Sequence, residues 1–188
     1  MTRVSLPSGA RVVQGFAQPE QEEDLLAQVD ASGWRSDLKR RVQHYGWRYD
    51  YLARRVTEDM ALGALPDWLA RLAEIVGAES GFERKPDQVI INEYLPGQGI
   101  SAHVDCEPCF GPTIASMGLG GSAQMTFKHR SNGNRYSLTL QPRMLLILSG
   151  EARYDWTHEI PARKSDLIDG GRHARTRRVS LTFRTVTL

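Results

Sequence analysis

The sequence predicts an α+β fold, mainly β, in which N-terminal helices pack against a double-stranded β-helix, or jelly roll. About eight short apolar or alternating runs recur after residue 87, separated by Gly, Pro and Asn and with no helical period between them. Apolar residues at helical spacing come earlier in the chain. The 188 residues fit one domain, with residues 1–86 as a helical layer and residues 87–188 as the jelly-roll core.

The N-terminal elements follow from local signals. A strand is expected around Val12, and a helix over residues 19–31, because proline followed by glutamates suits a first helical turn. A second helix is expected over residues 66–76, with Gly77 closing it. Its inward face would consist of Trp68, Leu69, Leu72, Ile75 and Val76.

The jelly-roll strands are expected wherever an apolar or alternating run lies between turn residues. Such spacing is typical of an antiparallel sandwich or barrel. The runs cover residues 88–95, 100–105, 113–119, 123–129, 135–141, 143–149, 153–160 and 177–187.

Composition excludes several classes of protein. The longest aliphatic run, residues 144–148, is far shorter than the roughly 20 residues that a membrane helix needs. No apolar segment that would indicate secretion follows Met1, and two cysteines are too few for a disulfide scaffold. We therefore expect a cytoplasmic monomer without a membrane partner.

Charge is unevenly distributed along the chain. The net charge is +2, but residues 35–55 and residues 163–184 each carry a net charge of +5, so the rest of the chain is acidic. Two basic segments on an acidic body indicate a polyanionic partner such as nucleic acid. The alternative is that these arginines only solvate the surface.

One segment carries a candidate metal site. His103 and Asp105 are two residues apart, so on a strand they share a face. His158, on a later predicted strand, would supply a third ligand. Two histidines and one carboxylate on one face of an ion are typical of non-heme Fe(II) oxygenases. The alternative is a hydrogen-bonded histidine at the rim of a barrel.

The last strand carries a candidate anion site. Its alternation places Arg178, Ser180, Thr182 and Arg184 on one face. Two arginines that point into a barrel are costly unless an anion neutralises them, and a five-carbon diacid that chelates iron would do so. The alternative is an edge strand with a solvated arginine face.

These motifs together resemble the AlkB family of Fe(II)- and 2-oxoglutarate-dependent dioxygenases. The resemblance covers about residues 88–186 and rests on N-x-Y-x-P-G, H-x-D, G-E-A-R-Y-D-W-T-H and R-x-x-x-x-x-R, in that order. Residues 94–105, 127–129 and 146–158, and the earlier residues 41–46, are most similar to the branch that modifies a wobble uridine in tRNA.

The resemblance implies a set of site residues. Fe(II), which reacts with O2, would be bound by His103, Asp105 and His158. The cosubstrate 2-oxoglutarate would be bound by Asn92, Tyr94, Arg178 and Arg184, with Arg178 on the distal carboxylate and Arg184 nearer the chelating end. Residues 34–57 would form a nucleotide-recognition lid, and the expected substrate contacts are Arg41, Tyr45, Trp47 and Glu107.

Cys106 and Cys109 form a C-x-x-C beside the candidate ligands. We interpret them as thiols on a loop without a role in the chemistry. A zinc site and a dithiol redox motif are the alternatives.

The sequence thus predicts a dioxygenase that oxidises an alkylated or modified base in RNA, such as tRNA, or in single-stranded DNA. The outcome would be demethylation or a stable hydroxyl group. Two alternatives stay open: the same chemistry on a protein or small molecule, and a catalytically silent binding module.

Overall fold

The computed structural model describes residues 5–36 and 38–188. Strands predominate among its elements, and all of their pairings are antiparallel. In chain order the elements are β1 (Ala10–Val13), α1 (Pro19–Asp30), β2 (Val42–Tyr45), the 3-10 helix η1 (Glu58–Met60), α2 (Asp67–Ser80), β3 (Gln88–Tyr94), β4 (Ile100–His103), β5 (Ile114–Gly120), β6 (Ala123–His129), β7 (Arg135–Leu140), β8 (Leu145–Leu148), α3 (Gly150–Tyr154), β9 (Trp156–Ile160), β10 (Ser165–Ile168), β11 (Gly171–Ala174) and β12 (Arg178–Arg184).

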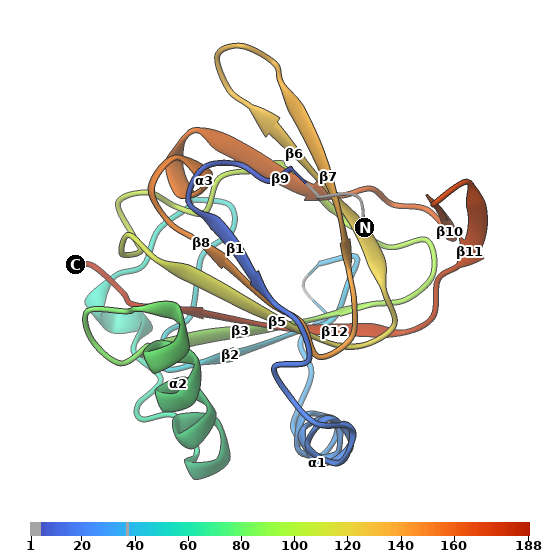
Figure 1. Ribbon diagram of the computed structural model, residues 1–188. Helices are drawn as coiled ribbons and strands as arrows, with labels where there is room; N and C mark the ends of the chain where they lie inside the picture. Colours follow the sequence, from blue (N-terminus) through green and yellow to red (C-terminus); the bar gives the residue numbers. More distant parts are fainter. Residues whose placement is uncertain (1–4, 37) are drawn as a thin grey trace.

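Two sheets form the jelly roll. The larger has the strand order β1-β8-β5-β12-β3-β2, the smaller has the order β4-β9-β6-β7, and β10 and β11 form a separate hairpin. Helices α1 and α2 lie against the outer face of the larger sheet, and the β6–β7 hairpin projects from the body (Figure 1). The predicted fold class is confirmed.

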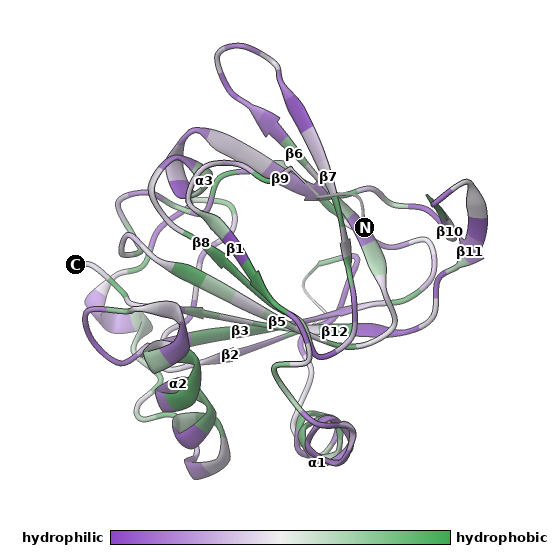
Figure 2. Cartoon of the chain, in the orientation of Figure 1, coloured by the Kyte–Doolittle hydropathy of each residue, from purple (hydrophilic) through white to green (hydrophobic). Residues whose placement is uncertain are grey.

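Two apolar clusters lie on opposite faces of the larger sheet. The outer cluster joins the helices to the sheet and includes Val29, Leu69 and Phe183, each with no exposed surface. The inner cluster lies between the two sheets and includes Phe127 and Leu146. Strands β5 and β8 at this interface are hydrophobic, whereas the tip of the β6–β7 hairpin is hydrophilic (Figure 2).

Strand β12 separates these two environments residue by residue. Val179, Leu181 and Phe183 belong to the outer cluster. The side chains of Arg178, Ser180, Thr182 and Arg184 instead line a cavity between the sheets. The alternation read from the sequence is therefore correct in register.

Helix α2 differs from its prediction at its C-terminal end. It runs to Ser80 and ends at Gly81, whose φ of 71° is the left-handed conformation that suits glycine. Gly77 lies inside the helix, where Pro86 packs so closely that an added Cβ would approach its Cδ to 2.9 Å. Ile75, expected to face inward, is 58% exposed.

Several short elements were not predicted. Strand β2 lies in the basic aromatic segment and pairs with β3. Its Gln43 is buried and donates to the Val29 carbonyl at 2.8 Å, so a polar residue takes a core position that a hydrophobic pattern does not reveal. Residues 150–154 form α3, which takes the first part of the run 153–160 that was expected as one strand.

Over the residues described, helices are too short or too polar to cross a bilayer.

Candidate active site

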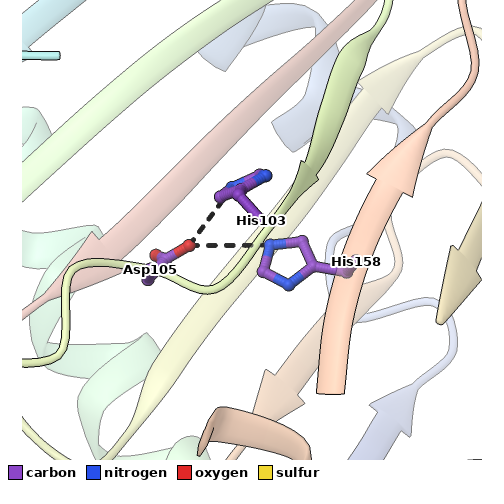
Figure 3. Close-up of side chains that lie close together, drawn as sticks. All are labelled: His103, Asp105 and His158. Carbon is purple, nitrogen blue, oxygen red and sulfur yellow. Dashed lines mark ion pairs between the residues drawn. The ribbon is translucent and has the colours of Figure 1, made fainter. Parts of the chain in front are cut away.

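His103, Asp105 and His158 meet between the two sheets. His103 ends β4 and is the cross-strand partner of His158 on β9, while Asp105 lies in the loop that follows β4. The Nε2 atoms of His103 and His158 lie 3.4 and 3.5 Å from Oδ1 of Asp105 (Figure 3). One ligand atom from each residue falls within 4.8 Å of the others, a spacing that suits one metal ion.

The surroundings of the three groups suit metal binding. The Nδ1 of His103 donates to the Ser101 carbonyl at 2.7 Å, so Nε2 is the ring nitrogen that faces the Asp105 carboxylate. Burial, with His103 nearby, lowers the pKa of His158 to about 3, so its ring is neutral. Burial alone would raise the pKa of Asp105, but Arg184 and the two histidines bring it well below its usual value. These donors therefore fit Fe(II).

Arg184 fixes the orientation of the Asp105 carboxylate. Its Nε donates to Oδ2 of Asp105 at 2.6 Å, which leaves Oδ1 directed at the histidines. Its Nη1 donates to Gln88 at 3.1 Å, and its guanidinium stacks 4.8 Å from the centre of the Phe110 ring. Arg184 was expected beside 2-oxoglutarate, and the structure adds a contact with the metal ligand itself.

Arg153 holds the loop that carries Asp105. Its side chain is buried and donates to the carbonyls of Asp105 at 2.8 Å, Cys106 at 3.2 Å, Phe110 at 3.3 Å and Gly111 at 3.2 Å. Four carbonyls on one guanidinium fix the backbone on both sides of the turn. Sequence reasoning missed this residue, although it lies inside the G-E-A-R-Y-D-W-T-H motif.

Behind the triad lies an inner cavity of about 60 Å³. Among its lining residues are Asn92, Tyr94 and Arg178, three of the residues expected to bind 2-oxoglutarate. Arg178 is buried, and its Nε has no hydrogen-bond partner among the residues described. Burial lowers the pKa of Arg178 to about 10, so it remains a cation at neutral pH. A buried cation of this kind fits an anionic ligand.

Gly118 on β5 provides the space for this guanidinium. A Cβ at Gly118 would lie 2.5 Å from Nη2 and 2.6 Å from Nη1 of Arg178. We expect Gly118→Ala to displace the guanidinium and raise the KM for 2-oxoglutarate about tenfold or more, because the charge stays but its position shifts. Steady-state kinetics would measure this change.

Gly133→Ala is the matched control, since an added Cβ at Gly133 meets nothing within 4 Å. Its φ of 73° makes this substitution locally strained, so the control applies to 2-oxoglutarate affinity and not to stability. An unaltered KM in Gly118→Ala would show that the cosubstrate does not depend on the position of Arg178.

On the other side of the triad lies an outer cavity of about 380 Å³. It shares His103, Asp105 and Arg184 with the inner cavity, so the two meet at the triad. Its other walls include aromatic and basic side chains: Arg40, Tyr49, Tyr51, Arg54 and Phe110. Its volume and its aromatic walls suit a base-sized ligand.

The four expected substrate contacts lie elsewhere; none is among the described residues that line the outer cavity. Arg41 donates to Glu93 at 2.7 and 2.8 Å and stacks on Trp34, so it is committed to a structural ion pair. Tyr45 packs edge-on against Trp68. Arg41 is unavailable to a substrate because it pairs with the buried carboxylate of Glu93, which also accepts from Arg177.

The other two expected substrate contacts, Trp47 and Glu107, also pack against or pair with residues of the protein itself. Trp47 is half-buried against the inner cluster. Glu107 is exposed and accepts from Arg130 at 2.8 Å. Tyr49 and Tyr51, from the same aromatic segment, line the cavity instead. The sequence showed the aromatic cluster but not which of its members face the site.

The interpretation of Cys106 and Cys109 as free thiols is wrong, because the structure joins them in a disulfide. The turn after Asp105 brings their Cα atoms to 5.3 Å, within the range that a disulfide spans. Their sulfur atoms lie 3.2 and 3.5 Å from the Arg54 carbonyl oxygen. With both sulfurs bonded to each other, the zinc alternative loses its thiolate ligands.

Comparison with known proteins gives a consistent result. The family model described as 2OG-Fe(II) oxygenase superfamily matches residues 9–184. The chain is 41% identical over 169 residues to the tRNA (carboxymethyluridine(34)-5-O)-methyltransferase alkbh8 of Xenopus tropicalis, covering 87% of this chain and 27% of that protein. It therefore spans about a quarter of the length of that relative.

Two further likenesses cover nearly the whole chain. The uncharacterized protein L905 of Acanthamoeba polyphaga mimivirus is 33% identical in an alignment of 193 positions that covers 99% of this chain and 89% of that protein. The solved structure of OsALKBH1 superposes with a TM-score of 0.74 at 17% identity, covering 96% of this chain and 98% of that one. At this identity the solved structure supports the fold alone.

Proposed function

This chain belongs to the 2OG-Fe(II) oxygenase superfamily and within it to the AlkB family, and from that membership we propose that it oxidises a modified base in nucleic acid. The predicted enzyme class and the predicted cofactors, Fe(II), 2-oxoglutarate and O2, are confirmed. The substrate is our proposal. The name of the Xenopus tropicalis relative supports tRNA as the first candidate.

Different residues of the chain would bind the metal and the cosubstrate. His103, Asp105 and His158 would hold Fe(II), and Arg178 would bind the distal carboxylate of 2-oxoglutarate in the inner cavity. Bound iron and 2-oxoglutarate would together use O2 to oxidise a C–H bond of the substrate, with release of succinate and CO2. Arg184 keeps Oδ1 of Asp105 directed at the metal position. Most residues that line the inner cavity are buried, which limits the access of water to it.

The outer cavity is the observation that carries the proposal. It opens on the triad from the side opposite Arg178, where an oxidisable C–H group must lie. Tyr49 and Tyr51, both partly exposed, offer aromatic surface to a base that has left its stack. Arg40 and Arg54 can meet the phosphate or a polar group of the same nucleotide.

Succinate release and nucleoside mass spectrometry would test this proposal together. We expect tRNA, and not bovine serum albumin, to stimulate succinate formation by the loaded enzyme. One nucleoside in the treated tRNA should gain an oxygen or lose a methyl group. His103→Ala protein is the inactive control. Stimulation by protein or small molecules only, with tRNA and single-stranded DNA unchanged, would refute the proposal.

The charge of the outer cavity predicts which bases are accepted. Among its described lining residues the only carboxylate is Asp105, which is engaged with Arg184 and the triad, whereas Arg40 and Arg54 are cationic. A base that carries a positive charge after N-alkylation would meet like charges there. We expect neutral or acidic modified bases to be preferred by about tenfold or more in kcat/KM.

Oligonucleotides that differ only in the modified base would measure this preference. Arg54→Gln should reduce it, and Arg71→Gln is the control, because Arg71 is exposed on α2 and is not among the described lining residues. Faster turnover of a cationic N-alkylated base would contradict the prediction.

A further inference from the structure

A tight turn at residues 50–55 presents a single leucine to solvent. Leu52 is 99% exposed, the highest value among the exposed large hydrophobic residues described. The turn is ordered by its own hydrogen bonds: Oδ1 of Asp50 accepts from the backbone N–H of Leu52 at 3.0 Å and of Ala53 at 2.9 Å. Asp50 and Arg55 also exchange two backbone hydrogen bonds. Leu52 is therefore held outward by a closed turn.

The turn is fastened to the loop that carries the metal ligand. Nη2 of Arg54 donates to the Val104 carbonyl at 3.0 Å, one residue before Asp105. The Arg54 carbonyl oxygen lies against the sulfurs of Cys106 and Cys109. These contacts fix the position of Leu52 relative to the triad.

Leu52 also lies beside the outer cavity. Tyr51, its neighbour in sequence, and Arg54 both line that cavity. Arg48, Arg54 and Arg55 are exposed around the turn, and although Asp50 lies 4.0 Å from Arg55 and offsets part of their charge, the three arginines can contact a phosphate backbone. The other large exposed hydrophobic residues have no adjacent residue in the sequence among the described residues that line the outer cavity: Leu62, Ile75, Leu95, Leu167 and Leu188.

We infer that Leu52 is a wedge that enters the base stack where the target nucleotide leaves it. When a base turns out of a stack into a pocket, its neighbours lose their stacking partner, and proteins fill such gaps with apolar side chains. Leu52 has the apolar surface, the fixed position and the neighbouring arginines for this task. The inference rests on the proposed function and names the partner as stacked nucleic acid, such as an RNA loop.

Two RNA probes of equal base composition would test the wedge. One is a hairpin with 2-aminopurine in its stacked loop, and the other is an unstructured strand with the same label. Binding is measured anaerobically with Fe(II) and 2-oxoglutarate, so that no turnover follows. We expect Leu52→Ala to weaken hairpin binding about tenfold and to reduce the rise in 2-aminopurine fluorescence, with under about twofold effect on the unstructured strand. The Leu52→Phe variant, which keeps a large apolar side chain, should bind the hairpin and raise 2-aminopurine fluorescence as the unaltered protein does.

Leu167→Ala is the matched control, because Leu167 is 58% exposed on the separate β10–β11 hairpin. Equal losses for both probes would overturn the inference and make Leu52 an ordinary contact. Unchanged binding of both probes would overturn it too, and would indicate another partner for the turn. If the unaltered protein neither binds nor oxidises RNA, the proposed function itself fails, which is a distinct result.

Discussion

His103→Ala and Asp105→Ala should each abolish the visible charge-transfer absorption that the protein shows anaerobically with Fe(II) and 2-oxoglutarate. The band requires a keto acid chelated to iron, and each substitution removes one of the three ligands that converge between the sheets. Turnover should fall by about a thousandfold or more, because no other carboxylate of the described residues lines the inner cavity.

His173→Ala is the matched control, since His173 is an exposed histidine on β11. It should retain the band and the full activity. Circular dichroism would show that the ligand variants still fold. A band that survives in His103→Ala would place the iron elsewhere and contradict the assignment of the triad.

Arg178→Lys should raise the KM for 2-oxoglutarate by about ten- to a hundredfold while iron binding survives. A lysine keeps the positive charge but loses the planar pair of donors that matches a carboxylate, and such charge-assisted hydrogen bonds contribute about 1.5–3 kcal/mol. Because Arg178 is at the opposite end of β12 from Arg184, the residue that contacts Asp105, the effect on Fe(II) affinity measured without the keto acid should be small.

Arg172→Lys provides the control for this substitution, since Arg172 is exposed on β11 and donates to Ser165. Its KM should match that of the unaltered protein. An Arg178→Lys enzyme with an unchanged KM would show that the distal carboxylate of 2-oxoglutarate binds elsewhere.

The sequence was sufficient where a residue's neighbours in the chain determine its direction. The alternation from Arg178 to Arg184 predicted which face of β12 is polar, because strand geometry alone decides it. The pairing of His103 with Asp105 was predicted for the same reason, although Asp105 lies beyond the end of β4. Placement of His158 beside them depended on the family resemblance and on the strand in which it lies.

Sequence reasoning failed where the partner is remote in the chain. Arg41 looked like a phosphate contact, but Glu93 on a neighbouring strand pairs with it. Arg153 looked like any motif residue, yet its four carbonyl partners come from residues 105–111. The disulfide between Cys106 and Cys109 is a separate case: the two residues are only three apart in sequence, and the conformation of the turn between them decides their bonding. In each case, three-dimensional proximity carried the information.

Strand β12 has a consequence for how the protein tolerates change. Its odd-numbered residues from Val179 to Phe183 are buried against the helices, and its even-numbered residues face the inner cavity. Substitutions at odd positions therefore alter how much folded protein a cell accumulates, since each such side chain contributes about 1.5–3 kcal/mol by its burial. Substitutions at even positions alter what each folded molecule does. Within the seven residues of β12, alternate positions therefore affect the cellular abundance of the protein and its specific activity.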